Sequence, residues 1–157
     1  MSARVWIHGG RVIDPSQKQD GPADLIVEDG RIVEMAAGLE APADAESIDA
    51  SGLVVAPGLI DLHVHFREPG GEHKETIATG AHAAVAGGFT TVWTMPNTDP
   101  PIDDPAAVGF VKAAGEAAAG ARVFPIGAAT IQQKGVQMTE IGELVSAGAV
   151  AVSDDGA

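Results

Sequence analysis

Short apolar runs, each followed by turn-forming residues, fill the first 56 positions of the chain. The runs are rich in Val and Ile, a composition typical of strands. The Asp29-Gly30 pair between two of them readily adopts the positive φ values of a tight hairpin turn. The pattern predicts a small N-terminal β domain over residues 1–56, built as a β-sandwich-like layer. Its predicted strands are 4–7, 11–13, 24–28, 31–34, 47–49 and 53–55.

The pattern changes from Pro57 onward, where strand-like apolar runs alternate with Ala-rich stretches that are compatible with helices. One such stretch opens at Asp104-Pro105, which combines an N-cap residue with proline at the first helical position. This alternation predicts the α/β class, with a parallel sheet and right-handed crossovers. Four strands make half of a (β/α)8 barrel, or an open sheet. The predicted order is strand 59–64, helix 75–86, strand 89–95, helix 105–119, strand 123–126, helix 139–148 and strand 149–153.

A weak repeat accompanies this alternation. Each predicted helix ends in an Ala-Gly pair just before a strand, at Gly87, Gly120 and Gly148. We expect each of these glycines to take the left-handed conformation that ends a helix and returns the chain to the sheet.

The composition narrows the classes of function. The chain has no cysteine, which excludes disulfides, a Cys-ligated zinc site and a thiol nucleophile, so any metal must be held by His and carboxylate side chains. The formal net charge of −13, without a basic stripe, argues against nucleic acid as a partner. No apolar run could span a bilayer, and the opening residues lack the apolar stretch of a secretory signal. We therefore expect a cytoplasmic protein with no membrane partner.

Side chains that can bind ligands occur where three of the four barrel-type strands end. The active sites of β/α barrels are built at these carboxyl ends and in the loops that follow them. The placement therefore predicts a functional site at this edge of the sheet. The side chains are His63 and His65 at the first strand, Asn97 after the second, and Asp154 and Asp155 after the fourth.

His63 and His65 have the spacing of a metal-binding pair. Residues two apart on a strand face the same side, so both imidazoles can reach one metal ion while Val64 packs on the other side. Neutral imidazole nitrogen suits Zn²⁺, and Asp154 or Asp155 can complete or bridge the site. The alternative is a pair of histidines on a partly exposed strand end, and the position at a barrel-type strand end favours the metal.

Two further side chains are candidates for substrate binding. Arg67 begins the loop after His65, and its guanidinium can hold a carboxylate in bidentate fashion, although a surface arginine fits the spacing equally well. Asn97 can hydrogen-bond a substrate or cap its own turn, and the spacing alone favours the turn.

Four segments carry a resemblance to a known family. They are PGLIDLHVHFREPG at 57–70, GGFTT at 87–91, MPNT at 95–98 and SDDG at 153–156. In order and approximate spacing they resemble the dihydroorotase form of the amidohydrolase superfamily. The resemblance implies a zinc-dependent, reversible interconversion of N-carbamoyl-L-aspartate and L-dihydroorotate in pyrimidine biosynthesis, with one or two Zn²⁺ per site. Allantoinases and hydantoinases share the His-x-His motif and remain an alternative.

The same resemblance implies roles for individual residues. It makes His63 and His65 zinc ligands, with the aspartate of the SDDG segment as a further ligand. Asp155 is the residue that the spacing favours, and Asp154 is the alternative. Arg67 and Asn97 match positions that hold the carboxylate and ring of the substrate.

One departure from the family concerns length. Two further histidine ligands and a catalytic aspartate lie on later strands in the family, so no catalytic residue can be assigned in this chain. A (β/α)8 barrel usually takes about 250 residues. We therefore expect residues 57–157 to form the first half of a truncated barrel that is inactive by itself. A homodimer and aspartate carbamoyltransferase are the candidate protein partners, and a non-catalytic scaffold subunit of that transferase is a further alternative.

Overall fold

The computed structural model describes residues 4–155 of the chain. Its internal contacts divide the chain into two compact units, Met1–Pro57 and Gly58–Ala157. Gly156, the last residue of the SDDG segment, lies outside the described residues. None of the helices between residues 4 and 155 is long and apolar enough to cross a membrane.

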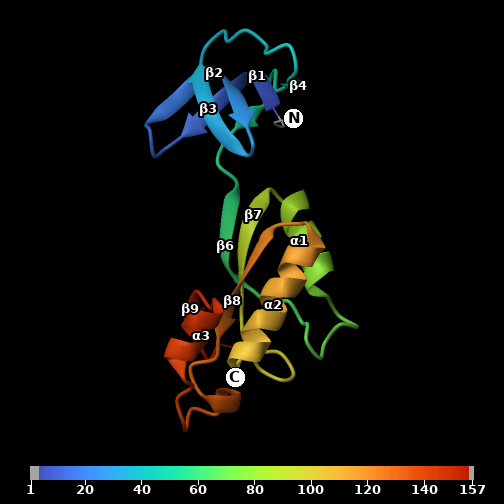
Figure 1. Cartoon of the computed structure of the whole chain (residues 1–157), viewed down its shortest axis with the longest axis vertical. Coiled ribbons are helices and arrows are strands. Elements are labelled where there is room, and N and C mark those ends of the chain that lie inside the picture. The colour runs from blue at the N-terminus through green and yellow to red at the C-terminus, as the bar shows by residue number, and fades with distance from the viewer. Residues whose placement is uncertain (1–3, 156–157) are drawn as a thin grey trace. The chain divides into compact units, whose positions relative to one another are not determined.

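The first unit is a single mixed sheet of five strands (Figure 1). Its strands run in the order β3-β2-β1-β4, with β5 also paired to β1. β2 is antiparallel to β1 and β3, whereas β4 and β5 are parallel to β1. Val12, Ala23 and Leu25 form its buried core. The strands are β1 (Arg4–Asp14), β2 (Gln19–Glu28), β3 (Arg31–Ala36), β4 (Glu46–Asp49) and β5 (Val54–Val55).

The predicted break between strands 4–7 and 11–13 was wrong, because both belong to β1. The register to β2 shifts between Ile7 and Gly10, which marks a β-bulge rather than a strand end. Gly9 has a φ of +75° there, and its N–H donates to Asp24 Oδ1 at 2.9 Å. The predicted hairpin turn is confirmed, since Asp29 and Gly30 both have positive φ values.

The second unit is a parallel sheet in the order β6-β7-β8-β9, with helices in the crossovers (Figure 1). The predicted alternation is confirmed, although β9 pairs over two residues only. Helix α1 packs on β7 and α2, and α2 packs on β8 and α3. Four strands and their helices form a partial sheet of the barrel type. The elements are β6 (Leu59–Val64), α1 (Ile77–Ala86), β7 (Phe89–Thr94), α2 (Pro105–Ala118), β8 (Arg122–Gly127), the 3-10 helix η1 (Ile131–Gln133), α3 (Ile141–Ala147) and β9 (Ala151–Val152).

The left-handed residue expected after each helix is the predicted glycine in one case of three. Gly148 has a φ of +113° and ends α3. After α1 the left-handed residue is Gly88, one position later than Gly87, and after α2 it is Ala119. Gly120 has another use, because a Cβ there would lie 2.9 Å from the backbone of α1. Close packing of α1 against the end of α2 therefore requires this glycine.

A substitution at Gly80 tests how closely α1 packs on the segment that contains His63 and His65. A Cβ at Gly80 would overlap the ring of Phe66, a buried residue directly after His65. We expect Gly80→Ala to lower the free energy of unfolding by about 1–3 kcal/mol, the cost of overpacking. Gly109→Ala in α2 is the matched control, because nothing lies within 4 Å of its added Cβ. Gly109→Ala should raise the free energy of unfolding by about 0.5–1 kcal/mol, measured by urea titration. A Gly80→Ala variant that is more stable than the native chain would contradict the close packing of α1 on Phe66.

Asp24 gives the first unit a pH-dependent stability. Its buried carboxylate accepts N–H bonds from Gly9 and Leu39 (2.9 and 3.0 Å), and these backbone bonds lower its pKa against the opposing effect of burial. A carboxyl whose pKa is lowered by folding stabilises the fold above its ordinary pKa of about 3.9, and the contribution disappears as the pH falls through the lowered value. Asp24→Asn should therefore cost about 1–3 kcal/mol at pH 7. The difference from the native chain should narrow below pH 4 in denaturant titrations, and an equal difference at pH 7 and pH 3 would contradict this.

Candidate metal centre

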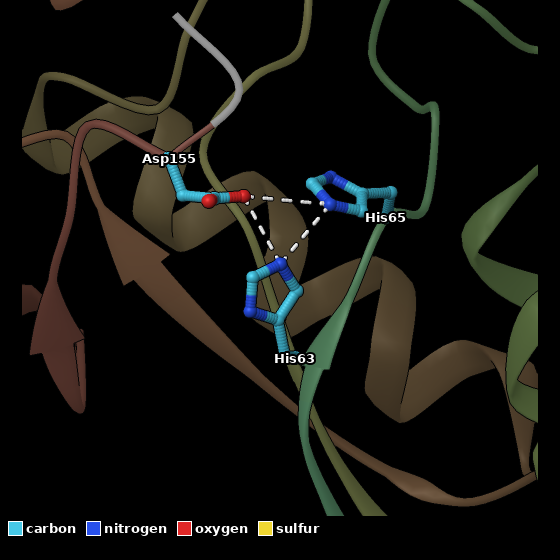
Figure 2. A group of neighbouring side chains, drawn as sticks. All are labelled: His63, His65 and Asp155. Carbon is cyan, nitrogen blue, oxygen red and sulfur yellow. Dashed lines mark hydrogen bonds and ion pairs between the residues drawn. The ribbon is translucent and has the colours of Figure 1, made fainter.

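The side chains predicted for the site come from opposite edges of the parallel sheet. His63 lies in β6 and His65 directly after it, whereas Asp155 follows β9, and β6 and β9 are the outer strands of the sheet. Figure 2 shows the two imidazole rings and the carboxylate turned toward one another. The sheet curls enough to bring its two edges together at the carboxyl ends of the strands.

Three donor atoms converge in this group. The Nε2 atoms of His63 and His65 lie 3.2 Å apart, and Asp155 Oδ2 lies 3.0 Å from the first and 3.5 Å from the second. No other group of three or more His, Cys, Asp or Glu with its donor atoms within 4.8 Å of one another is found among residues 4–155.

The spacing of these atoms fits a metal ion. Two ligand atoms of a tetrahedral ion, each about 2.0–2.2 Å from the metal, lie about 3.3–3.5 Å apart. The observed separations of 3.0–3.5 Å need only small adjustments to match this. The two imidazoles and one carboxylate also form a donor set that suits divalent transition metals. The group can therefore hold a metal ion.

The local structure of β6 explains the orientation of the histidines. Asp61 Oδ1 accepts the N–H of His63 at 3.0 Å and fixes the backbone where the strand departs from regular pairing with β7. Val64 packs against the hydrophobic core, as the alternation along a strand predicts. The core therefore holds the intervening residue while both imidazoles face the open side.

Asn97 lies beside His65 rather than serving its own turn. Its Oδ1 is 2.8 Å from His65 Nδ1, and an amide oxygen can only accept, so Nδ1 carries the proton. The lone pair of His65 then lies on Nε2, the atom that faces the metal-binding group. Partners of this kind fix the tautomer and the ring orientation of metal-binding histidines. The spacing alone favoured a turn cap, whereas the hydrogen bond that the structure shows for the Asn97 side chain is the one to His65.

Arg67 and Asn97 lie together in the neighbouring loops. Both line a pocket of about 200 Å³, together with His73 and Lys74. The pocket adjoins the metal-binding group through the Asn97–His65 hydrogen bond. Arg67 and Lys74 outnumber Asp99 among its lining residues, and this excess of positive charge suits an anionic ligand.

The two consecutive aspartates have different partners. Asp155 faces the histidines, whereas both oxygens of Asp154 are bound by the loop after β8. Hydrogen bonds from the Thr130 side chain, and from the backbone of Thr130 and Ala129, hold the pKa of Asp154 below its ordinary value despite partial burial. The geometry therefore favours Asp155, and not Asp154, as the metal-binding carboxylate.

Comparison with known proteins shows the family to which the chain belongs. The family model described as "Dihydro-orotase-like" matches residues 52–157, about two thirds of the chain. The chain belongs to the dihydroorotase-like family. The matched region includes both histidines, Asn97 and Asp155.

Curated relatives support the same family. A dihydroorotase from Geotalea daltonii is 57% identical over 152 residues, which are 97% of this chain and 36% of that protein. A dihydroorotase from Anaeromyxobacter sp. (strain K) is 53% identical over 99% of the chain and 36% of its own length. The chain thus spans 36% of the length of the dihydroorotases that it matches.

Solved structures share the fold at lower identity. The L-hydantoinase (dihydropyrimidinase) of Arthrobacter aurescens is 26% identical, with a TM-score of 0.74 over 97% of this chain and 32% of its own. A D-hydantoinase is 27% identical, with a TM-score of 0.68 over 81% of this chain and 27% of its own. These relatives are cyclic amide hydrolases, which agrees with the expectation from the dihydroorotase-like motifs.

The sequence did not reveal the loop that supports Asp155. Gln133 Nε2 donates to the backbone oxygen of Asp155 at 3.2 Å, and Thr130 binds Asp154. Residues 128–138 carry no apolar period and no known motif, so we did not expect them to contribute to the site. The Thr and Gln side chains in a Gly-containing loop after a barrel-type strand were the only available signal.

Removal of one imidazole tests the metal-binding group. We expect His63→Ala to weaken Zn²⁺ binding by more than about 100-fold, beyond the 10- to 100-fold loss typical of residues that only support a ligand. Isothermal titration of the full chain with Zn²⁺ measures this. His82→Ala is the control, because His82 Nε2 contacts the Ala118 backbone oxygen at 2.7 Å, away from the group, and its loss should leave the affinity unchanged. Equal affinity in native and His63→Ala chains would rule out the site.

Proposed function

We propose that the chain serves in a dihydroorotase, the enzyme that interconverts N-carbamoyl-L-aspartate and L-dihydroorotate. The observation that carries this proposal is the 53–57% identity to curated dihydroorotases over almost the whole chain. The matched stretch spans the positions of all three residues that converge in the metal-binding group. The proposed contribution of the chain is part of a zinc site and part of the substrate site.

The proposed zinc ligands are His63 and His65 through Nε2, and Asp155 through Oδ2. Zinc, when bound, supplies an activated water and polarises the amide carbonyl of the substrate. Asn97 holds His65 in the tautomer that presents a free Nε2 lone pair. Val64 keeps the strand anchored in the core between the two ligands. The distances of 3.0–3.5 Å between these three ligand atoms support this assignment. The prediction of one or two Zn²⁺ per site is unchanged.

Arg67 and Asn97 are the proposed substrate-binding residues. The planar guanidinium of Arg67 matches the carboxylate that dihydroorotate and carbamoyl aspartate share. Asn97 gives its oxygen to His65, which leaves its amide NH₂ to donate to the substrate. Their common pocket beside His65 supports the arrangement. We assign no general acid or base among residues 4–155.

We further propose that residues 57–157 supply the first four strand–helix units of a (β/α)8 barrel, with residues 1–56 as a separate β domain. The parallel order β6-β7-β8-β9 and the match to part of the hydantoinase structures support this. A homodimer and an association with aspartate carbamoyltransferase stay predictions, and so does a cytoplasmic location.

A hydantoinase is the second candidate, because the solved structures that share the fold include hydantoinases. The cationic pocket beside the metal-binding group favours an acidic ring over a neutral one. The two functions therefore differ in the substrate that the Arg67 pocket selects.

A chimera tests the proposed function. Residues 1–157 replace the matching segment of the Geotalea daltonii dihydroorotase, which supplies the rest of the enzyme. We expect zinc-dependent turnover of L-dihydroorotate and none of hydantoin or allantoin, measured for each ring by chromatography. A folded, zinc-loaded chimera that hydrolyses hydantoin, or no substrate at all, would overturn the proposal.

Arg67→Ala in the chimera should raise KM for dihydroorotate by roughly 10- to 100-fold, because a charged hydrogen bond contributes about 1.5–3 kcal/mol. Arg67→Lys keeps the charge without the bidentate geometry. Its KM for dihydroorotate should therefore lie between the values of the unsubstituted chimera and of Arg67→Ala. An unchanged KM in Arg67→Ala would remove the substrate-binding role of this residue.

A further inference from the structure

Asp154 makes three hydrogen bonds to the loop that follows β8. Its Oδ1 accepts the N–H groups of Ala129 (2.9 Å) and Thr130 (3.0 Å), and its Oδ2 accepts the Thr130 hydroxyl at 2.6 Å. Both carboxylate oxygens are therefore engaged within the protein. Asp154 is thus committed to the loop, although it is adjacent to a proposed metal ligand.

The loop that Asp154 holds has an uncommon backbone. Gln132 and Gln133 have φ values of +53° and +54°, in the left-handed region that residues with a Cβ seldom adopt. Such a conformation persists only where surrounding contacts impose it. Here Thr130 Oγ1 also accepts the N–H of Gly135 at 2.9 Å, and Asp103 Oδ2 accepts the N–H of Gln132 at 2.7 Å. Asp154 and Asp103 therefore fix this turn from two sides.

The fixed loop in turn contacts Asp155. Gln133, held in its left-handed conformation, donates from Nε2 to the backbone oxygen of Asp155 at 3.2 Å. The Asp155 N–H donates to Ser153 Oγ at 3.0 Å, and the Ser153 backbone oxygen accepts the N–H of Ala129 at 3.3 Å. The backbone on both sides of the Asp155 side chain is therefore tied to the loop that Asp154 holds.

Asp155 needs this support because β9, the short strand that precedes it, does little to fix its position. β9 pairs with β8 at two positions only, Ile126↔Ala151 and Gly127↔Val152. The Asp155 side chain is 42% exposed, so close packing does not fix its rotamer. A carboxylate on such a segment would lose conformational freedom on binding a metal, and preorganisation by neighbouring groups removes that cost.

We propose that Asp154 is a positioning residue for Asp155, acting through the Thr130–Gln133 loop to hold that carboxylate against the two histidines. The inference rests on the proposed metal site. The proposal gives the two adjacent aspartates different roles: Asp155 contacts the metal, and Asp154 holds Asp155 in position.

The competing role for Asp154 is direct metal binding, and one conservative variant separates the two. In Asp154→Asn the amide oxygen can still accept from Ala129 and Thr130, and the NH₂ group can donate to the Thr130 hydroxyl. The loop contacts survive, whereas a neutral amide is a much poorer metal ligand than a carboxylate. A positioning residue therefore tolerates Asn but not Ala, and a ligand tolerates neither.

The experiment is a Co²⁺ titration of the full chain, followed by the visible absorption of the bound ion. We expect Asp154→Ala to weaken Co²⁺ binding by about 10- to 100-fold, the range for groups that orient a metal ligand. Asp154→Asn should stay within about threefold of the native chain, by the same reasoning. Thr130→Val, which removes the hydroxyl at nearly constant volume, should weaken binding in the same direction as Asp154→Ala.

Two controls separate positioning from loss of stability and from failure of the site. Asp104→Ala removes the N-cap hydrogen bond to Ala107 in α2 and so lowers the stability of the fold at a position outside the loop. Its Co²⁺ affinity should equal that of the native chain. Asp155→Asn should abolish tight binding. Circular dichroism of each variant establishes that the fold is retained, and the same substitutions in the Geotalea chimera provide a second measurement for any variant that unfolds.

Every other result of the Co²⁺ titrations contradicts a specific part of the proposal. Native-like binding by Asp155→Asn would overturn the metal site, and the positioning role with it. Where binding does depend on Asp155, native-like affinity in Asp154→Ala would overturn the positioning role alone. Equal losses in Asp154→Ala and Asp154→Asn would make Asp154 a ligand, and a matching loss in Asp104→Ala would reduce its effect to general stability.

Discussion

The curl of the parallel sheet is the constraint on which the metal-binding group depends, because its ligands lie on opposite edges of that sheet. In a flat sheet the outer strands β6 and β9 would be three spacings of about 4.8 Å apart, or about 14 Å, too far for one His and one Asp side chain to meet. Here His63 Nε2 and Asp155 Oδ2 are 3.0 Å apart. The curl of the sheet, together with the chain that runs from Val152 at the end of β9 to Asp155, closes that gap.

Close packing between helices and strands maintains this arrangement. A Cβ at Gly115 in α2 would lie 2.7 Å from Val123 Cβ in β8, and one at Gly127 would lie 2.8 Å from Leu144 in α3. At Gly115 helix α2 therefore approaches the sheet so closely that only glycine fits, and at Gly127 a larger residue would displace the Leu144 side chain. Fully buried Val92 and Leu144 fill the space that remains. Protein interiors at this density transmit small displacements, so the helix layer and the ligand geometry are mechanically linked.

Polar residues then fix each donor atom separately. Asp61 holds the backbone of His63, Asn97 sets the tautomer of His65, and the loop tied to Asp154 supports Asp155. Asn97 and the loop after β8 lie at the carboxyl edge of the sheet, whereas Asp61 lies within β6, two residues before His63. The fold thus supplies both the residues that can bind a metal and the groups that orient them.

The sequence by itself determined the alternation of strands and helices, the His63–His65 pair and the family, because periodicity, N-cap chemistry and motif order are local properties of the chain. It favoured Asp155 over Asp154 as the metal-binding carboxylate from the family spacing, and it favoured a turn role for Asn97. It also split β1 at Gly9-Gly10. Only the tertiary structure showed the bulge, the partners of Asp154 and the Asn97–His65 contact. A bulge depends on the partner strand, and the orientation of a side chain depends on distant neighbours: Thr130 lies 24 residues from Asp154, and His65 lies 32 residues from Asn97. Contacts between distant segments leave no mark in a local pattern.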